Sequence, residues 1–313
     1  MRVLITGATG FVGSNLTRRL HAQGEEIAVL MRLQSSSDRV ADIIRDLKIF
    51  KGDVSDASKV RRAMSTFRPN LVYHIAAAGA SPGHNDNDRT IMLKSNFLGS
   101  WNVVCSAQEV GVKRVIYTGT SGVYKDSNAP ISENDTLAPK TMYAVSKIAA
   151  WFLSEAVLRD TRTSIVNIRL FTPFGPWEEQ TRLIPYVINK AINNEPILLT
   201  SGKQARDFIY VDDVVDALIA AGNSDCDSQI INIGSGKVVT IKDVVNIIIK
   251  LVGSKSETLF GALPHRKNEI WEVCANVERA MSVLDWIPQT SLIDGLQKTI
   301  NWIRRSLSDS SVE

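Results

Sequence analysis

The sequence predicts an α/β protein with a doubly wound parallel sheet and a smaller C-terminal lobe. Three observations support this prediction. The chain opens on a short apolar run, residues 2–5, which glycines follow immediately. Apolar runs with β-branched residues then alternate with helical patterns over residues 1–170, which is the order of a parallel sheet covered by helices on both faces. A chain of 313 residues is long enough for such a domain and an added lobe.

Composition and charge exclude several classes of protein. Apolar residues make up 44% of the chain and charged residues 22%, as in ordinary globular domains. The net charge is only +3, and no run of Lys and Arg indicates nucleic-acid binding. No apolar run has the length of a membrane span, and the three cysteines form neither a metal pattern nor a disulfide framework. We therefore expect a cytoplasmic protein without a metal ion, a membrane anchor or a nucleic-acid partner.

The glycine-rich turn after the first predicted strand is the first functional motif. Gly7 permits a tight turn, Gly10 allows a pyrophosphate to approach the backbone, and Gly13 allows the following helix, residues 14–22, to pack closely on the strand. The pyrophosphate then lies at the helix N-terminus. The alternative is an ordinary strand-to-helix turn, but the flanking strand and helix favour a Rossmann-type dinucleotide site. The cofactor contacts expected in this motif are Gly7, Gly10, Phe11, Val12 and Gly13.

The end of the second predicted strand, residues 27–31, indicates which dinucleotide binds. An acidic residue there would bind the ribose 2′-hydroxyl of NAD, whereas an arginine accommodates the 2′-phosphate of NADP. This chain has Arg32 in that region, with Ser35 and Ser36 as further donors, and no acid at the strand end. We therefore expect NADP in preference to NAD. The alternative is that Arg32 is a solvated surface charge and that NAD binds without the acid.

The third predicted strand, residues 47–50, precedes two further candidates for cofactor contact, Asp53 and Val54. An aspartate in this position can accept a hydrogen bond from the adenine amino group. It can equally cap the helix that begins near Ala57.

The fourth predicted strand, residues 71–75, leads into a small-residue segment, a polar loop and a helix over residues 91–110. Small residues after the strand let a cofactor pass close to the backbone, and the polar loop lies over the site. His74 is expected to pack within the sheet and not to act as a base. The cofactor contacts expected in this region are Ala76, Ala77, Ala78 and Asn96, and Ser81 is expected to contact the substrate.

The fifth predicted strand, residues 114–118, leads to Thr120, and a helix then opens with Tyr143 and Lys147. Residues four apart share one helix face. A phenol titrates at about 10, and an ammonium one turn away, together with a positive nicotinamide, lowers its pKa. Tyr143 can then exchange a proton with a sugar hydroxyl while hydride moves to or from the cofactor, and Thr120 can donate a hydrogen bond to the same oxygen. In a chain that also has the glycine-rich turn, the combination of Thr120, Tyr143 and Lys147 indicates a catalytic site.

Together these motifs resemble the extended short-chain dehydrogenase/reductases that act on nucleotide sugars, a family of epimerases, dehydratases and ketoreductases. The resemblance covers nearly the whole chain, and it rests on residues 6–13, Gly52 with Asp53, Thr120 with Val123 and Tyr124, Tyr143 with Lys147, and residues 206–213. It implies that Tyr143 is the acid/base, that Lys147 also binds the nicotinamide ribose, and that Thr120 orients the sugar oxygen. It also implies a homodimer formed through the helices near residues 96–110 and 143–157.

Two departures from the family pattern narrow the reaction. Family dehydratases carry Asp-Glu directly after the catalytic threonine, and decarboxylases carry Glu at the second of these positions, whereas this chain has Ser121 and Gly122. Elimination and decarboxylation therefore lack their acid–base group. Hydride chemistry at C4 of a nucleotide-activated hexose remains, either as a 4-ketoreductase of a keto-deoxysugar or as a 4-epimerase of a UDP-sugar or sugar acid with tightly bound NAD. The NADP-type strand end favours the ketoreductase slightly.

The C-terminal half is expected to bind the nucleotide sugar. Arg206 and Arg266 resemble the family arginines that bind the substrate diphosphate, a role that suits the guanidinium fork. For Arg266 the alternative is a surface basic cluster. Thr172 stands where family members commonly have an asparagine that contacts substrate phosphate. The substrate contacts expected overall are Ser81, Ser121, Thr172, Leu183, Arg206 and Arg266.

The predicted domain organisation is interwoven, because the sequence contains no linker or repeat. Residues 1–170 form the dinucleotide-binding domain, its sheet continues in residues 205–235, and residues 171–313 are mainly the nucleotide-sugar lobe. Residues 197–211 are predicted to form a hairpin. Thr240 is predicted to cap a helix over residues 241–252.

Two other classes of protein remain as alternatives. The first is a non-catalytic sensor that only binds a dinucleotide, and the intact Thr120, Tyr143 and Lys147 argue against it. The second is a short-chain enzyme of the flavonoid or steroid type without a nucleotide handle. Arg206 and Arg266 argue against this second class.

Overall fold

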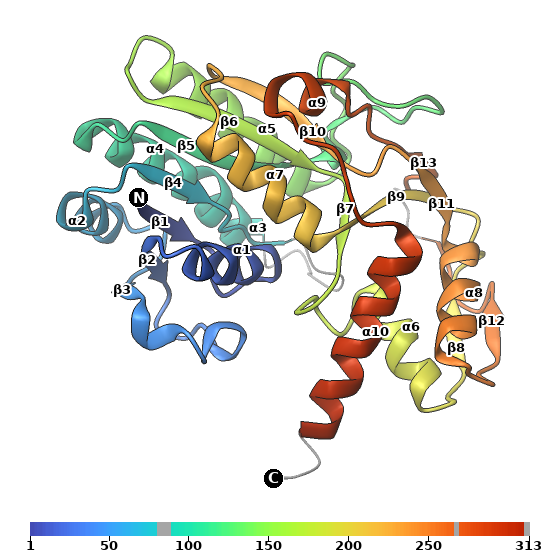
Figure 1. Ribbon diagram of the computed structural model, residues 1–313. Coiled ribbons are helices and arrows are strands. Elements are labelled where there is room, and N and C mark those ends of the chain that lie inside the picture. Colours follow the sequence, from blue (N-terminus) through green and yellow to red (C-terminus); the bar gives the residue numbers. More distant parts are fainter. Residues whose placement is uncertain (80–88, 266–268, 310–313) are drawn as a thin grey trace.

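The computed structural model describes residues 1–79, 89–265 and 269–309. Its centre is a seven-stranded sheet in the order β10-β6-β5-β4-β1-β2-β3, in which all neighbouring strands run parallel (Figure 1). The strands are β1 (Arg2–Thr6), β2 (Glu26–Met31), β3 (Lys48–Lys51), β4 (Leu71–His74), β5 (Arg114–Thr120), β6 (Ser164–Leu170) and β10 (Gln229–Ile233). The α/β prediction with a doubly wound sheet is confirmed.

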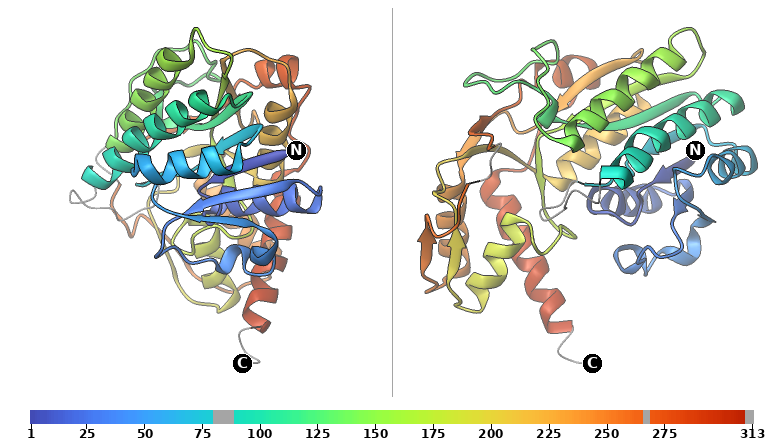
Figure 2. Two further views of the ribbon diagram at one scale, coloured as in Figure 1. Left: turned by 90° about the vertical axis from the view of Figure 1, so that its left-hand side faces the viewer. Right: turned by 180° about the vertical axis from the view of Figure 1, so that it is seen from behind.

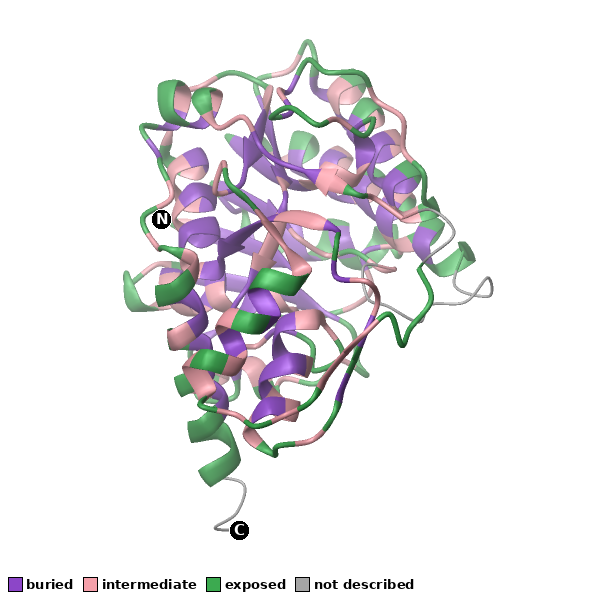
Figure 3. Ribbon diagram, turned by 90° about the vertical axis from the view of Figure 1, so that its right-hand side faces the viewer, coloured by how far each residue is buried: buried purple, intermediate pink, exposed green. Residues whose placement is uncertain are grey.

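Helices cover both faces of this sheet, as Figures 1 and 2 show from opposite sides. The helices over one face are α1 (Phe11–Ala22), α7 (Val211–Asn223) and α9 (Glu278–Leu284). Those over the other face are α2 (Ala57–Phe67), α4 (Gly99–Val110) and α5 (Met142–Leu158). Because both faces are covered, the central strands are buried between helices whose outer sides are exposed (Figure 3).

Short helical turns connect some of these elements. A four-residue helix, α3 (Arg89–Met92), and a π-helix, η4 (Leu93–Leu98), lead directly into α4. In the described part of the chain, the 3-10 turns are η1 (Asp38–Val40), η2 (Ile44–Asp46) and η5 (Ser121–Val123).

The second lobe has its own apolar core and two small sheets. In the four-stranded sheet, β9 (Ala205–Tyr210) is the central strand, and it pairs with β7 (Thr172–Phe174), β11 (Val238–Thr240) and β13 (Glu272–Val273). The two-stranded sheet joins β8 (Ile197–Leu199) and β12 (Thr258–Phe260) in parallel. The helices of this lobe are α6 (Leu183–Ile192), α8 (Ile241–Val252) and α10 (Leu292–Asp309).

The predicted hairpin over residues 197–211 is wrong. Its two strands belong to different sheets, because β8 pairs with β12, which lies far along the chain, and β9 pairs with β7, β11 and β13. Within the predicted sheet continuation, residues 205–235, β10 joins the main sheet, whereas β9 lies in the second lobe.

Candidate active site

The glycine-rich turn joins β1 to α1 in a conformation that needs its glycines. Gly7 has φ +78°, and a Cβ there would lie 2.6 Å from the backbone nitrogen of Ala76. A Cβ at Gly13 would lie 2.0 Å from the carbonyl oxygen of Gly7, so the helix packs directly on the turn. Any side chain at either position would force the backbone apart.

The N-terminus of α1 is shaped for an anion. Gly10 is the N-cap, no side chain caps this end, and the first turn, which contains Phe11 and Val12, carries no acidic residue. Backbone N–H groups at a helix start with no side-chain acceptor, together with the positive end of the helix dipole, suit a phosphate group. These described residues therefore fit the pyrophosphate of a dinucleotide.

The segment after β4 is held beside this turn by Asn96. The Asn96 side chain accepts from the backbone N–H of Ala78 at 2.8 Å, donates to the Ala78 carbonyl at 3.0 Å and donates to Ser146 Oγ at 2.9 Å. The residue is only 1% exposed. Its amide therefore positions Ala78 against α5. The direct cofactor contact expected of Asn96 stays a prediction.

The residues after β3 settle one alternative. Asp56, and not Asp53, caps α2, since Asp56 accepts from the backbone N–H groups of Ser58 and Lys59. Asp53 instead accepts from the backbone and hydroxyl of Ser55. The capping role considered for Asp53 is therefore wrong. Val54 is buried and lies against Gly99, where a Cβ would be 2.6 Å from Val54 Cγ2.

The segment that follows β2 contains two arginines of interest, Arg32 directly after the strand and Arg39 in η1. Arg32 follows the strand and is exposed to solvent. Arg39, which the sequence analysis missed, donates to the carbonyl of Thr9 at 3.2 Å and to Glu179 at 3.1 Å. It thus connects the glycine-rich turn to the loop after β7. Its proximity to the turn depends on the η1 turn, which no local motif indicates.

His74 has the packed position expected for it. It is fully buried, and its ring nitrogens lie 2.7 Å from Thr6 Oγ1 and 2.9 Å from Ser100 Oγ. Burial lowers its pKa to about 3, so the ring is neutral at physiological pH.

Thr120 and Tyr143 lie at the ends of neighbouring elements. Thr120 is the last residue of β5, and its hydroxyl accepts from the backbone N–H of Gly122 at 3.2 Å. Tyr143 lies in the first turn of α5, which Thr141 caps by accepting from the Ala144 N–H. The cap and the strand end therefore fix the starting points of both side chains.

Lys147 lies one turn after Tyr143 and is buried under the helix. Its Nζ lies 4.2 Å from the centre of the Tyr117 ring, and the Tyr117 hydroxyl donates to the Lys147 carbonyl at 2.9 Å. A cation over an aromatic face is favourable when desolvated. Burial nevertheless lowers the pKa of Lys147 to about 7.

The expected lowering of the Tyr143 pKa by Lys147 is not found in the described chain. Burial raises the pKa of Tyr143 to about 12, and the positive charge of Arg182 offsets this only in part. Desolvation is the largest effect on both groups, and it disfavours the phenolate of Tyr143 and the ammonium of Lys147. Both groups therefore tend toward their neutral forms. A further positive charge nearby would lower both pKa values and so favour the phenolate of Tyr143.

Arg182 and Glu178, in the loop before α6, are functional candidates that the sequence analysis missed. Glu178 is only 8% exposed, and its Oε1 lies 3.7 Å from Arg182 Nε. Burial raises the pKa of Glu178 to about 8. The sequence signal that could have identified this pair is the spacing of two opposite charges, four residues apart, just before a helix.

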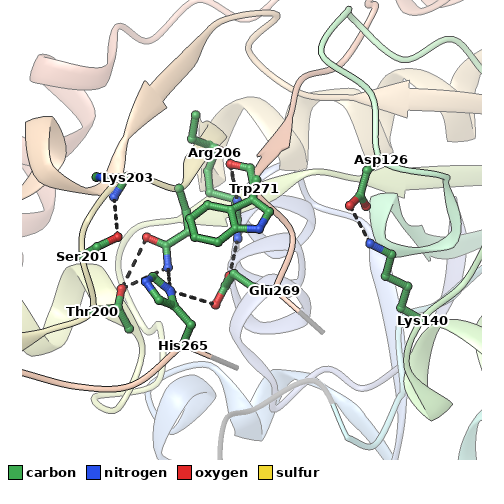
Figure 4. Close-up of polar contacts among 11 residues, drawn as sticks. Asp126, Lys140, Thr200, Ser201, Lys203, Arg206, His265, Glu269 and Trp271 are labelled. Carbon is green, nitrogen blue, oxygen red and sulfur yellow. Dashed lines mark hydrogen bonds and ion pairs between the residues drawn. The ribbon is translucent and has the colours of Figure 1, made fainter. Parts of the chain in front are cut away.

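Four of the remaining substrate candidates lie in described elements. Ser121 begins η5, Thr172 begins β7, and Leu183 begins α6, and all three are partly exposed. Arg206 lies on β9, and its Nη2 donates to Glu269 at 3.0 Å (Figure 4). Ser81 and Arg266 lie outside the described residues. No grouping of three or more potential ligand side chains in the described ranges would hold a metal ion.

The fold and the site together define a dinucleotide-dependent enzyme of the extended short-chain dehydrogenase/reductase type, with a glycine-rich turn before α1, Thr120 at the end of β5, and Tyr143 and Lys147 in α5. The NAD dependent epimerase/dehydratase family matches this chain over residues 3–234. The chain therefore belongs to this family, and the resemblance inferred from the sequence is confirmed.

Relatives of known activity match over almost the whole chain. UDP-glucuronate 4-epimerase of Thermodesulfobacterium geofontis is 27% identical, over 97% of this chain and 96% of its own. UDP-glucose 4-epimerase of Mycolicibacterium smegmatis is 29% identical, over 97% and 99%. Among solved structures, MoeE5 in complex with UDP-glucose and NAD has 30% identity and a TM-score of 0.87, over 98% of this chain and all of its own.

No helix within the described part of the chain is both long and apolar enough to span a membrane.

Proposed function

We propose that this protein is a 4-epimerase of a nucleotide-activated sugar that works with bound NAD. The observation that carries the proposal is the placement of Thr120 and Tyr143 at adjoining element ends, with Lys147 one turn away and no acid at positions 121 and 122. Bound NAD would supply the acceptor and donor of a hydride at C4. The relatives named as 4-epimerases of UDP-sugars support this reaction and a UDP-sugar substrate.

The chain's own residues have separable roles in this proposal. Tyr143 accepts the proton of the C4 hydroxyl and later returns it. Thr120 donates a hydrogen bond to the same oxygen and fixes its orientation. Lys147, whose pKa of about 7 makes its charge responsive to its surroundings, is protonated more fully when an anion or hydroxyl oxygen lies beside it. Arg206 binds the diphosphate through its planar fork.

The cofactor gives the decisive test. The purified protein is denatured, the released dinucleotide is identified, and turnover is measured with UDP-glucose and UDP-glucuronate in the absence of added cofactor. We expect stoichiometric NAD and interconversion of one 4-epimer pair. An empty site without activity on either sugar would contradict the proposal.

A second candidate function is the 4-ketoreductase with NADP, and Arg32 is the observation that favours it. An exposed arginine after a strand that ends without an acid suits a 2′-phosphate. The NAD complexes among the solved relatives support NAD instead. Titration of the cofactor-free protein with NADPH and NADH separates the two candidates. A preference for NADPH that Arg32→Ala removes would support the reductase.

We also propose a cytoplasmic homodimer, joined through the outer faces of α4 and α5. Ordinary charge content and the free cysteines are compatible with a reducing compartment.

A further inference from the structure

Arg169 of β6 carries a buried guanidinium that the proposed reaction does not use. The residue is 1% exposed, and it lies in the main sheet between Gly119 of β5 and Asn232 of β10 (Figure 1). Its Nη1 is buried and has no hydrogen-bond partner within the described ranges, and the same holds for Asn167 Oδ1, two residues earlier on the same face of the strand. An unsatisfied buried nitrogen of a charged group is unfavourable for folding, so stability does not account for this arginine.

The Arg169 guanidinium faces an aromatic ring. Its central carbon lies 4.8 Å from the centre of the Tyr124 ring, and a cation over an aromatic face is favourable when both are desolvated. Burial raises the pKa of Tyr124, and the charge of Arg169 offsets this in part. The buried carboxylate of Glu133 is used elsewhere, since it accepts from the Asn232 N–H at 2.9 Å and lies 3.4 Å from Arg279 Nε. The Tyr124 ring is therefore the main support that the structure gives to this charge.

Tyr124 in turn anchors η5, the turn at the catalytic end of β5. The Tyr124 N–H donates to the Ser121 carbonyl at 3.1 Å, and the Gly122 N–H donates to Thr120 Oγ1 at 3.2 Å. The Tyr124 hydroxyl donates to Asn232 Oδ1 at 2.7 Å. The side chain of Tyr124 thus fixes the turn that begins at Thr120 to β6 through its ring and to β10 through its hydroxyl.

We propose that Arg169 is a positioning residue for Thr120, because its guanidinium supports the Tyr124 ring and this ring holds the turn from which the Thr120 hydroxyl is directed. The proposal rests on the proposed function, since it takes Thr120 as the residue that orients the C4 oxygen. A displacement of about 1 Å in a residue that positions a substrate lowers a rate by as much as about a hundredfold. A buried cation that costs stability and fixes a catalytic turn has a role in turnover and not in folding.

The first test compares Arg169→Met with Arg114→Met. Arg114 is also buried, at the opposite end of β5, but its guanidinium is well bonded, to Ser164 Oγ at 2.8 Å and to the Cys226 carbonyl at 2.7 Å. We expect Arg169→Met to lower kcat at least about tenfold, with KM and bound NAD within about twofold of the wild type. Its midpoint of urea unfolding should be no lower than that of the wild type, because an incompletely bonded buried charge is removed. Arg114→Met should lower the midpoint and leave kcat within about twofold.

Hydrogen exchange followed by mass spectrometry reports on the turn directly and needs no turnover. Arg169→Met should accelerate exchange in a peptide covering residues 119–125 by at least about tenfold, and leave peptides from β1 and α1 unchanged. Unchanged exchange in the turn would overturn the proposal. Faster exchange throughout the protein, or an unfolding midpoint well below that of the wild type, would make Arg169 a structural residue and would overturn it as well.

Tyr124→Leu removes the ring that Arg169 supports and tests the same link by a second route. If both residues act through one contact, the losses in kcat from Arg169→Met and Tyr124→Leu overlap in the double variant. Losses that multiply would contradict the link. If Tyr143→Phe abolishes turnover and Arg169→Met does not change kcat, the positioning role fails and the 4-epimerase proposal stands. Absence of epimerase activity in the wild type would remove the proposed function, and the exchange data would still report whether Arg169 holds the turn.

Discussion

At the scale of single residues, Tyr143 and Lys147 show how burial prepares a site for chemistry. Burial raises the pKa of Tyr143 to about 12 and lowers that of Lys147 to about 7, and both shifts disfavour the charged forms. A positive nicotinamide beside the phenol would reverse part of the Tyr143 shift, since an opposite charge favours the phenolate. Without a ligand, the charged forms of Tyr143 and Lys147 are therefore disfavoured. A charged ligand beside them would change the protonation of both groups.

Replacement of Tyr143 by Phe tests its catalytic role. The phenol is the proposed proton carrier, and general acid–base catalysis contributes about 10²–10⁴-fold. We expect Tyr143→Phe to lower kcat by at least about a hundredfold, with cofactor affinity nearly unchanged. Turnover and cofactor fluorescence titration measure the two effects. A dinucleotide sensor would show no change in its response, and retained turnover would contradict the role of Tyr143.

The lowered pKa of Lys147 predicts how the stability of the protein depends on pH. Its pKa is about 7 in the folded chain, whereas an unperturbed lysine side chain, as in the unfolded chain, has a pKa of 10.5. Between these values the unfolded chain binds more protons, so Lys147 contributes stability that rises as the pH increases from about 7 toward 10. In Lys147→Met this contribution is absent. The free energy of unfolding of the variant, relative to the wild type, should therefore fall across this window in urea titrations of the cofactor-free protein.

The exposed lysine Lys113 provides the control for this prediction. Its side chain is 73% exposed, so Lys113→Met should show the same pH slope as the wild type. If Lys147→Met and Lys113→Met behave alike across the same pH window, then Lys147 is not desolvated as described.

At the scale of elements, Asn96 of the π-helix η4 joins Ala78, in the segment after β4, to Ser146 of α5. Asn96→Ala would leave the N–H and carbonyl of Ala78 without their side-chain partner. We expect a loss of about 2–3 kcal/mol in the free energy of unfolding, because each buried polar group left unsatisfied costs about 1–3 kcal/mol. Cofactor affinity should fall as well, since Ala78 follows the strand beside the glycine-rich turn.

Asn102→Ala is the matched control, because Asn102 makes one hydrogen bond, to the Val54 carbonyl, from the adjoining helix α4. Its cost should be about 1 kcal/mol. Chemical denaturation and dinucleotide titration of both variants measure the difference. Equal losses in the two variants would contradict the positioning role of Asn96.

Elements whose signals are local could be predicted from the sequence. The glycine-rich turn needs its residues for steric reasons, the Tyr143–Lys147 spacing follows from helix geometry, and Thr240 caps α8 as expected. Contacts between distant segments could not be predicted. The pairing of β8 with β12 and the approach of Glu269 to Arg206 join residues that are about 60 positions apart, and no periodic pattern specifies such a partner.

The pKa values at the site could not be predicted from the sequence either. The Tyr-x-x-x-Lys spacing suggested that an ammonium controls the phenol, but the pKa values depend on how deeply both groups are buried. The Tyr143 pKa also depends on the positive charge of Arg182, which lies 39 residues further along the chain and lowers it. Tertiary structure therefore decides the sign of the shift, whereas the sequence identifies only the participants.

At the scale of the whole molecule, the two lobes are tied together by the loop after β7. Asn15 of α1 donates to the carbonyl of Pro176 at 3.0 Å. Trp177 packs edge-on against Trp302 of α10 at 4.9 Å, and the Arg18 guanidinium lies 5.1 Å from the Trp177 ring. The loop thus contacts α1 of the first lobe and α10 of the second.

The outer face of α4 and α5 is the surface that we expect to join two copies of the chain. These helices lie side by side over one face of the sheet (Figure 2). Large apolar side chains remain exposed on them and on the turns leading into α4: Ile91, Leu93, Leu98, Trp101, Met142, Val145 and Phe152. On α5, Met142, Val145 and Phe152 are spaced by three and seven residues, which places them on one face of that helix. Contiguous exposed apolar patches mark interaction sites.

Charge substitutions on this face test the dimer. Trp101 and Phe152 are 41% and 52% exposed, and a carboxylate buried at a symmetric interface would be repelled by its own copy. We expect the wild type to sediment as a dimer, and Trp101→Glu and Phe152→Glu to sediment as folded monomers at micromolar concentration. Ile293→Glu is the control, because Ile293 is 54% exposed on α10, in the other lobe, and this variant should stay dimeric. Dimers that survive both substitutions on α4 and α5 would place the interface elsewhere, whereas monomers that keep their turnover would show that each copy contains a complete site.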